Sequence, residues 1–271
     1  MATAVRSVRD AIAAARVELE AAGCDSARLD AELLLADALD TDRARLHSHP
    51  EADVPAAAEE RIGRHVARRA AREPVAYIIG WRGFRRIELK VDRNVLIPRP
   101  ETELLVEVAL ELPRGASVHE VGTGSGAVAL ALADERPDLL VTASDSSTAA
   151  VAVARANAER LGLEIGLSVA RGLPAEAAGA DLVVANLPYV AEAEMAGLAP
   201  EILDYEPRDA LVSGPDGLDA IRDLVHQAPA GCRLALEHAP HQGARVRSLL
   251  REPLTLRDLA EHERVTVGIA P

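Results

Sequence analysis

The stretch EVGTGSGAVALALA, residues 120–133, decides the fold of this chain. Three glycines, Gly122, Gly124 and Gly126, alternate where an apolar strand turns into an apolar helix. Glycine at such a turn lets the backbone approach a ligand closely and adopt dihedral angles that other residues avoid. A dinucleotide-binding turn places its last glycine three residues after the second, whereas the interval here is two. The pattern favours a nucleotide-type ligand at a strand end without identifying it.

From residue 101 onward, the chain alternates strands with helices. The expected strands are ASVHEVG (116–122), LLVTASD (139–145), IGLSVA (165–170), ADLVVAN (180–186), CRLALEH (232–238) and RVTVGIA (264–270). The expected helices are 124–134, 148–161, 216–228 and 241–251. This alternation indicates an α/β fold with a parallel sheet covered on both faces, and such sheets bind ligands beyond the carboxyl ends of their strands.

Residues 1–74 are expected to form a small helical bundle. A helix is predicted between 5 and 23, and another follows Pro55 and runs to about Arg72. Between them, Asp25 and Ser26 can cap a second helix. Its expected buried stripe is Leu29, Leu33, Leu34 and Leu39.

Residues 75–100 are expected to form a β-hairpin linker. The segment RRIELKV alternates apolar and polar residues, which is typical of a strand. Three aromatic residues lie within eight positions, namely Tyr77, Trp81 and Phe84. These rings either pack the hairpin against its neighbours or shape a substrate pocket.

The composition excludes several classes of protein. A formal charge of −13 and an aromatic content of 2% disfavour direct binding to nucleic acid. No apolar stretch approaches the roughly 18 residues of a membrane span, and the amino-terminal segment lacks the apolar centre of a secretory signal. We therefore expect a cytoplasmic protein without membrane contact. Cys24 and Cys232 lie far apart in sequence and predict no disulfide framework.

Two acidic residues flank the glycine turn as candidate ligand contacts. Asp145 ends the next strand about 20 residues beyond the glycines, where a carboxylate can bind ribose hydroxyls. The alternative for Asp145 is a helix N-cap, to which Ser146 or Ser147 is also suited. Glu120 could accept a hydrogen bond from the amino-acid portion of a cofactor or from nearby backbone amides.

These residues resemble the motifs of the S-adenosylmethionine-dependent methyltransferases, which have a Rossmann-like sheet. The resemblance implies S-adenosyl-L-methionine as cofactor, S-adenosyl-L-homocysteine as product, and cofactor contacts from Glu120, Gly122, Thr123, Gly124, Ser125, Gly126 and Asp145. The family often has an acidic residue at the end of the third strand, where this sequence has Ala170, Arg171 and Gly172. The adenine contact is therefore expected from the backbone or from elsewhere.

The fourth strand ends in Asn186-Leu187-Pro188-Tyr189, which is the candidate catalytic and substrate-binding motif. A planar nitrogen is a poor nucleophile because its lone pair is delocalised. The Asn186 side-chain oxygen and the Leu187 carbonyl can each accept one N–H and direct that lone pair at the methyl group. Pro188 restricts the turn and Tyr189 offers a stacking face. Asn186 is also expected beside the cofactor, and the alternative is a structural turn with a packing tyrosine.

The tetrapeptide resembles the Asn-Pro-Pro-Tyr signature of methyltransferases that act on planar nitrogens. Leu187 replaces the first proline, and the leucine form also occurs in adenine dimethyltransferases of ribosomal RNA. This motif alone is compatible with both amide and adenine substrates.

The segment EPVAYIIGWRGFRRIELKVDRNVLIPRPETELLVE, residues 73–107, resembles the bacterial release factor glutamine methyltransferases. Residues 25–39 and 210–225 resemble the same family, so the likeness covers nearly the whole chain. It implies that residues 1–74 form a five-helix-type domain that helps to hold the release factor. Residues 101–271 would form the catalytic domain. Pro98, Arg99 and Pro100 would contact the substrate.

The resemblance implies methylation of the N5 amide nitrogen of the glutamine in the Gly-Gly-Gln motif of class 1 peptide chain release factors. Three alternatives stay open: glutamine methylation of a ribosomal protein, adenine N6 methylation of RNA, and a release-factor-binding module without activity. Relatives have a glutamate and a glutamine where Glu237 and Gln242 stand. The spacing of His238 and His241 alone could suit a metal, but sequence places no third ligand, so we expect a structural turn and no metal site.

Overall fold

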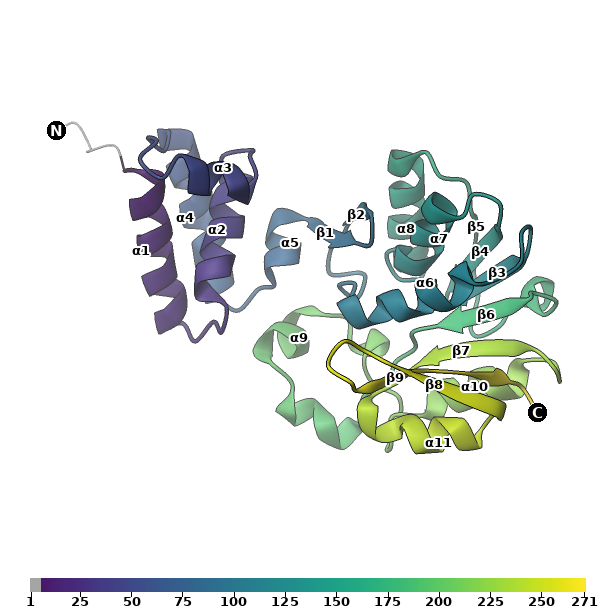
Figure 1. The fold of residues 1–271 in the computed structure, drawn as a ribbon. Coiled ribbons are helices and arrows are strands. Elements are labelled where there is room, and N and C mark those ends of the chain that lie inside the picture. Colours follow the sequence, from purple (N-terminus) through teal and green to yellow (C-terminus); the bar gives the residue numbers. More distant parts are fainter. Residues whose placement is uncertain (1–5) are drawn as a thin grey trace. The chain divides into compact units, whose positions relative to one another are not determined.

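The computed structural model describes residues 6–271, and their contacts divide the chain into two compact units (Figure 1). The first unit extends to Gly80 and also contains Ala199–Tyr205. The second unit consists of Trp81–Leu198 and Glu206–Pro271. The units therefore differ from the expected division at residues 74 and 100. The roles expected for the domains stay predictions.

The first unit is helical. Its helices are α1 (Val8–Ala21), α2 (Ala27–Ala38), α3 (Arg43–Ser48), α4 (Ala56–Ala70), α5 (Val75–Ile79) and α9 (Pro200–Tyr205). Ser7 caps α1 by accepting a hydrogen bond of 3.2 Å from the Asp10 N–H. Residues 75–79, which the sequence predicts as part of the hairpin linker, are helical instead.

The stripe predicted for α2 is wrong in part. Leu34 is fully buried, but Leu29 is 42% exposed, and Leu33 and Leu39 are only half-buried. The buried face is formed instead by Ala27, Ala31, Leu34, Leu35 and Ala38. These positions follow one side of a helix at three-and-four spacing, and Leu29 lies on the opposite side.

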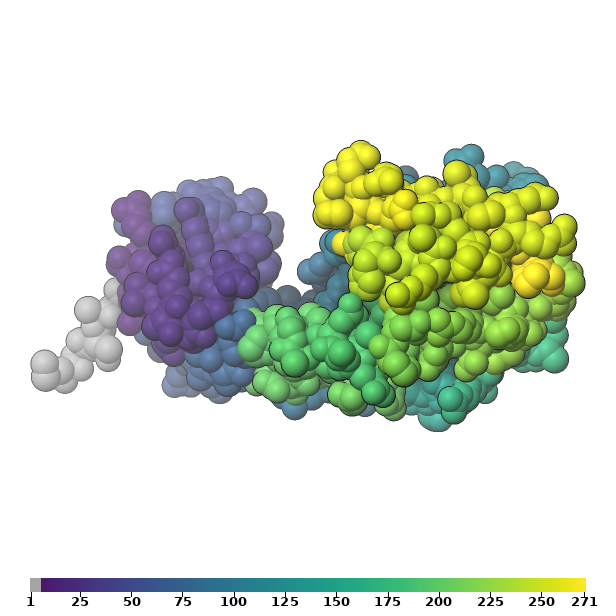
Figure 2. All heavy atoms as spheres, turned by 90° about the horizontal axis from the view of Figure 1, so that it is seen from below, coloured from purple at the N-terminus to yellow at the C-terminus, as the bar shows by residue number. Residues whose placement is uncertain are grey.

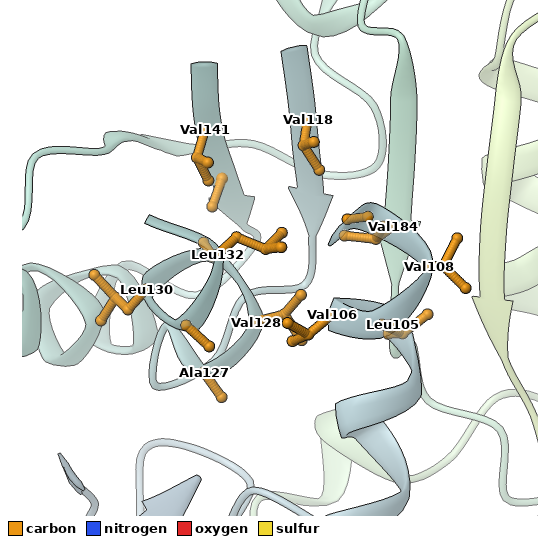
Figure 3. Close-up of a cluster of buried hydrophobic side chains, with 14 of the residues drawn as sticks. Leu105, Val106, Val108, Val118, Ala127, Val128, Leu130, Leu132, Val141 and Val184 are labelled. Atoms are coloured by element: carbon orange, nitrogen blue, oxygen red, sulfur yellow. The ribbon is translucent and has the colours of Figure 1, made fainter. Parts of the chain in front are cut away.

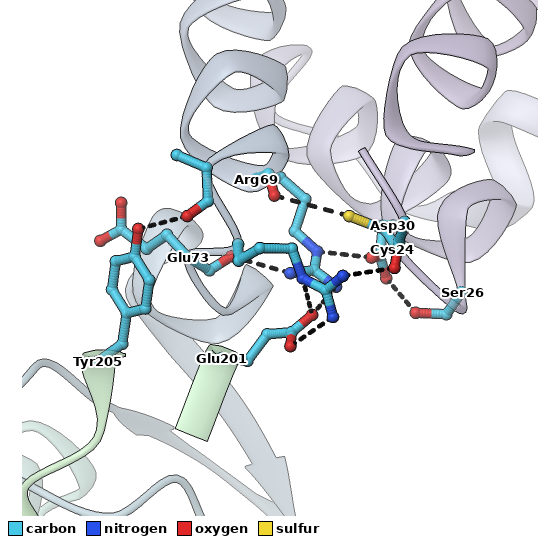
Figure 4. Close-up of polar contacts among 10 residues, drawn as sticks. Cys24, Ser26, Asp30, Arg69, Glu73, Glu201 and Tyr205 are labelled. Carbon is cyan, nitrogen blue, oxygen red and sulfur yellow. Dashed lines mark hydrogen bonds and ion pairs between the residues drawn. The ribbon is translucent and has the colours of Figure 1, made fainter. Parts of the chain in front are cut away.

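A network of ion pairs joins α9 to the end of α4 within the first unit (Figure 4). The Arg69 guanidinium lies 2.7 Å from an Asp30 carboxylate oxygen and 2.7 Å from a Glu201 carboxylate oxygen. Arg72 binds Glu201 with both Nε (2.9 Å) and Nη2 (2.7 Å). The Arg69 side chain is only 6% exposed, so its charge depends on these partners.

The second unit contains a hairpin and a seven-stranded sheet. The hairpin pairs β1 (Trp81–Phe84) with β2 (Ile87–Lys90). The sheet strands are β3 (Ser117–Val121), β4 (Leu140–Asp145), β5 (Gly166–Val169), β6 (Leu182–Ala185), β7 (Arg233–Glu237), β8 (Arg251–Arg257) and β9 (Glu263–Ile269). Their order is β5-β4-β3-β6-β7-β9-β8.

The expected parallel sheet is confirmed from β3 to β7 and is wrong at one edge. Strand β9 is antiparallel to both β7 and β8. The β8–β9 pair is a hairpin, whose short connection requires antiparallel strands. The sequence prediction missed β8 because its sequence, REPLTLR, is not a continuous apolar run: Leu254 and Leu256 stand among arginine, glutamate, proline and threonine.

Helices cover both faces of the sheet. The α-helices of the second unit are α6 (Glu103–Leu110), α7 (Ala127–Glu135), α8 (Thr148–Leu161), α10 (Asp219–Gln227) and α11 (Gly243–Ser248). The 3₁₀ turns are η1 (Pro100–Thr102), η2 (Ala175–Ala177), η3 (Glu192–Gly197), η4 (Arg208–Ala210) and η5 (Pro240–Gln242).

Alternate residues of β6 face opposite hydrophobic clusters. Leu182 and Val184 pack with side chains of α6 and α7, as Figure 3 shows around Val184. Val183 and Ala185 pack with side chains of α10 and α11. This period of two is expected for a central strand that is buried on both sides.

The C-terminal residues, yellow in Figure 2, form a continuous part of the surface of the second unit. Within residues 6–271, no helix combines the length and the apolar character that crossing a membrane requires.

Candidate active site

A cavity of about 240 Å³ lies in the second unit, where β3, β4 and β6 end. Its lining includes most of the predicted site residues: Pro98, Arg99, Glu120, Gly122, Thr123, Gly124, Ser125, Asp145, Asn186, Leu187 and Pro188. The fold therefore brings the glycine turn and the Asn186 motif to one cavity. Gly126, Pro100 and Tyr189 lie outside the lining.

Asp145 stands at the end of β4, where its two oxygens contact the neighbouring turns. Oδ2 accepts a hydrogen bond from the Gly124 N–H (2.9 Å), and Oδ1 accepts one from the Ser147 N–H (2.9 Å). Helix α8 is capped by Ser147, which accepts a hydrogen bond from the Ala150 N–H. Each Asp145 oxygen keeps a free lone pair because a carboxylate offers about four acceptor sites.

The glycine turn leaves room for a ligand. Gly124 has a φ of +55°, and a Cβ placed there would meet no atom within 4 Å, so this backbone faces open space. Gly122 has a φ of +77°, and a Cβ there would lie 3.1 Å from Leu187 Cδ2. Glycine at 122 thus allows the motif after β6 to approach the turn after β3.

Glu120 is buried at the end of β3 and braces the glycine turn. Its Oε2 accepts hydrogen bonds from the Thr123 hydroxyl (2.6 Å) and the Ala129 N–H (3.0 Å). Burial raises the pKa of this carboxyl to about 8, although both hydrogen bonds act in the opposite direction. Of the two contacts expected for Glu120, the one with a nearby backbone amide is present, and the carboxyl is mostly protonated at neutral pH.

Asn186 follows β6 and is held from one side. Its Nδ2 donates a hydrogen bond to Thr102 Oγ1 (2.9 Å). Amide nitrogen and oxygen point in opposite directions, so Oδ1 remains available as an acceptor. This orientation is the one that acceptance of a substrate N–H requires.

Tyr189 is not one of the residues that line the cavity. Its hydroxyl is 3.5 Å from Glu237 Oε1, and its backbone carbonyl accepts a hydrogen bond from Gln242 Nε2 (2.8 Å). Burial, and then the charge of Glu237, raise the pKa of this phenol. The stacking face expected of Tyr189 therefore stays a prediction.

Arg99 and its neighbours are anchored by Glu206, which sequence reasoning missed. Glu206 pairs with the Arg99 guanidinium, and its Oε2 accepts a hydrogen bond from the Ile97 N–H (3.2 Å). The Glu206 side chain is only 2% exposed. The sole sequence signal was its position shortly before residues 210–225, which carry the family resemblance.

Other lining residues were also missed. They are Asn94, Val95, Leu96, Thr102, Ala127, Val128, Ser146, Ser147, Ala150, Pro207, Asp209 and Ala210. Most lie within or beside quoted motifs, and that proximity was the signal that could have found them. Residues 170–172 are not part of this lining, so the question of the adenine contact stays open at the third strand.

The histidines after β7 have structural contacts. His238 is fully buried, and its ring nitrogens lie 2.9 Å from the Ala239 carbonyl and 2.8 Å from Thr266 Oγ1. His241 is paired with Glu194 at 3.3 Å. In the described part of the chain, no three His, Cys, Asp or Glu side chains gather in a way that could hold a metal.

Similarity to known proteins extends over both units. The family model described as PrmC N-terminal domain matches residues 10–80, and the one described as Methyltransferase small domain matches residues 100–214. The release factor glutamine methyltransferase of Xylella fastidiosa is 45% identical over 258 residues, which cover 90% of this chain and 94% of that protein. This chain belongs to the release factor glutamine methyltransferase family.

The release factor glutamine methyltransferase of Pseudomonas aeruginosa is similarly close, with 46% identity over 257 residues that cover 90% of this chain and 92% of that protein. Membership of the release factor glutamine methyltransferase family confirms the resemblance found in the sequence. The match to the small methyltransferase domain confirms the Rossmann-like methyltransferase fold.

Proposed function

We propose that this chain transfers a methyl group from S-adenosyl-L-methionine to the N5 amide nitrogen of the glutamine in the Gly-Gly-Gln motif of class 1 peptide chain release factors. The single observation that supports it best is the cavity that joins the Asp145 and glycine-turn side to Asn186. Family membership supports the substrate class.

The residues on the glycine side fit this cofactor. Asp145 keeps acceptor capacity for two ribose hydroxyls, and the open space beside Gly124 admits a ligand against the backbone. Glu120 supplies a buried carboxyl near the same turn. Bound S-adenosyl-L-methionine supplies an electrophilic methyl group and leaves as S-adenosyl-L-homocysteine.

The Asn186 side binds and orients the acceptor. A primary amide presents two N–H groups in its own plane, and Asn186 Oδ1 and the Leu187 carbonyl would each accept one. Two acceptors define the plane of the amide, so its lone pair is directed out of that plane. Holding the reacting atoms about 3 to 3.5 Å apart lowers the activation barrier by several kcal/mol.

No motif residue is assigned as a general base. The free lone pairs of Asp145 are assigned to the ribose hydroxyls, and the buried Glu120 carboxyl, with a pKa of about 8, is mostly protonated at neutral pH. The nitrogen is nearly non-basic before transfer and loses its extra proton readily after transfer, so departure of this proton to solvent is sufficient.

Mass spectrometry of release factors incubated with the protein and S-adenosyl-L-methionine tests the proposal. We expect a gain of one methylene on the Gly-Gly-Gln peptide and none on a release factor in which alanine replaces that glutamine. Ribosomal proteins and RNA in parallel reactions address the alternative substrates. Methylation of either one, with the release factor unchanged, would overturn the assignment.

A further inference from the structure

The buried side chain of Gln242 contacts the end of the Asn186 motif. Gln242 is 0% exposed and belongs to η5, the turn that follows β7. Its Oε1 accepts a hydrogen bond from the Ala239 N–H (3.0 Å), and its Nε2 donates to the carbonyls of Tyr189 (2.8 Å) and Asp216 (3.2 Å). One amide therefore joins three segments of the backbone.

The contacts of Gln242 require donors as well as an acceptor. The hydrogen bond from Ala239 is a local cap of η5, and a glutamate at this position would supply it equally well. The carbonyls of Tyr189 and Asp216 both accept, so only a side chain with at least two donor hydrogens satisfies them together. Tyr189 lies 53 positions from Gln242, and Asp216 lies 26 positions from it. The two N–H groups thus act on distant loops and not on the turn that contains Gln242.

Gly217 leaves room for the hydrogen bond between Gln242 and Tyr189. Its φ is +76°, and a Cβ placed there would lie 2.2 Å from the Tyr189 carbonyl oxygen and 2.6 Å from Gln242 Nε2. Any other residue at 217 would push these two groups apart.

The motif Asn186-Leu187-Pro188-Tyr189 is anchored on both sides. Strand β6 ends in the sheet at Ala185, immediately before it. Immediately after it, the Val190 N–H donates to the Leu211 carbonyl (2.9 Å). Gln242 adds a hydrogen bond at the last residue of the motif itself.

We infer that Gln242 is a positioning residue that holds the Leu187 carbonyl in the direction required to accept an N–H of the methyl acceptor. Two residues separate this carbonyl from that of Tyr189, and the ring of Pro188 fixes one of the torsions between them. Movement of the Tyr189 peptide group therefore changes the direction of the Leu187 carbonyl. Gln242 is not one of the residues that line the cavity, so it acts through the backbone of the motif. The inference rests on the proposed function for the identity of the acceptor.

Gln242→Met tests the inference, because methionine has a similar length but no N–H to donate. In single-turnover assays at saturating release factor and S-adenosyl-L-methionine, we expect methyl transfer to slow at least about tenfold, since small misplacements of reacting atoms are costly. The affinity for S-adenosyl-L-methionine, measured by isothermal titration, should not change, because Asp145 and the glycine turn keep their contacts. A wild-type rate, or an equal loss of rate and of cofactor affinity, would overturn the inference while the proposed function stands.

Gly217→Ala should give the same result, because its Cβ would collide with both partners of the hydrogen bond. Gly231→Ala is the matched control: Gly231 has a φ of +91°, so alanine there is similarly strained, but its Cβ would meet no atom within 4 Å. This control should transfer the methyl group at the wild-type rate. Thermal melting identifies a temperature at which every variant is folded.

The double variant of Gln242→Met and Gly217→Ala separates one shared hydrogen bond from two independent defects. Because both substitutions act on the same bond, their effects on the transfer rate should be non-additive. Additive losses of rate would mean that the two residues act independently, and this outcome would overturn the inference.

Hydrogen exchange of the Val190 amide gives a readout that needs no activity. In Gln242→Met, this amide should exchange faster than in the wild type, whereas the Val184 amide within β6 should keep its protection. If the wild type methylates no release factor, the proposed function fails and exchange alone decides whether Gln242 holds the motif. Unchanged exchange at Val190 would then overturn the inference.

Discussion

The Asp145 carboxylate, at the end of β4, both stabilises the glycine turn and can bind a ligand. It holds the glycine turn through the Gly124 N–H and keeps free lone pairs toward the cavity. We expect Asp145→Ala to weaken S-adenosyl-L-methionine binding by about 1.5 to 3 kcal/mol, the value of hydrogen bonds to a charged group. Isothermal titration measures this. Asp134→Ala, which removes an exposed carboxylate near the end of α7, is the matched control. Equal affinities for the two variants would remove Asp145 from the cofactor site.

We expect substitution of Asn186 to change the rate of methyl transfer more than the affinity for the cofactor. We expect Asn186→Ala to leave cofactor affinity nearly unchanged and to cut the transfer rate by at least about 10², or roughly 2.7 kcal/mol of barrier. Leu187→Pro should be tolerated, because only the Leu187 carbonyl is proposed to act. Single-turnover assays on one release factor compare the two. An Asn186→Ala enzyme of wild-type rate would contradict the acceptor mechanism, and an inactive but folded Leu187→Pro enzyme would show that the leucine side chain shapes the pocket.

At this scale, the sequence alone predicts the residues that a motif marks, and it misses those that need a distant partner. Gly122, Asp145 and Asn186 stand at strand ends, where residue type and position suffice. Thr102 contacts a side chain 84 positions away, and Glu206 contacts Arg99 107 positions away. No local pattern encodes such pairs.

Among the elements, α9 was not predicted from the sequence, and it belongs to the first unit although it is far from residues 6–80 in sequence. Its Glu201 carboxylate binds Arg69 and Arg72, so α9 packs with the first unit. Burial raises the pKa of Glu201, but the hydrogen bonds from the two arginines outweigh burial and lower it. Strand β8 and the buried face of α2 were the other misses, because both depend on which neighbours pack against them.

We expect Glu201→Ala to destabilise the first unit by about 2 kcal/mol. This is less than the roughly 3 to 5 kcal/mol of a broken buried pair, because Asp30 still neutralises Arg69. Calorimetry and hydrogen exchange of the α9 amides measure the effect. Glu20→Ala breaks an exposed pair with Arg16 and is the control. If both substitutions had the same small effect, α9 would not depend on the ion pairs.

Removal of the first 80 residues tests whether the helical unit serves recognition. A protein that begins at Trp81 should still bind the cofactor, yet it should methylate an intact release factor poorly, because contacts remote from the reacting atoms orient them. Truncation also deprives Glu201 of both arginines, so full-length Glu201→Ala must be assayed beside it. Full activity of the truncated protein on the intact release factor would reduce the unit to a stability element.

For the molecule as a whole, buried carboxyls predict how stability depends on pH. Glu120 has a folded pKa of about 8, above its ordinary value of 4.5. Between these values, the folded state holds a proton that the unfolded state has lost, so stability falls as pH rises through this window. Glu237, with a pKa of about 7, acts in the same direction.

Glu120→Gln should therefore melt at a higher temperature than the wild type, by a margin that grows from about pH 5 to pH 8. Glutamine keeps an oxygen for the Thr123 and Ala129 donors and cannot ionise. Melting curves of both proteins across this range measure the margin. A difference in melting temperature that does not change with pH would mean that the pKa of Glu120 is not raised in the folded protein.

The division into two units has a consequence for the order of events during synthesis. Arg69 and Arg72 leave the ribosome long before Glu201, since 129 positions separate Arg72 from Glu201. At about 5 to 20 residues per second, the ribosome needs roughly 6 to 26 seconds to add that length. During this interval, the nascent helical unit holds two arginines without their shared carboxylate. The first unit therefore cannot form its ion pairs with Glu201 until most of the second unit has been synthesised.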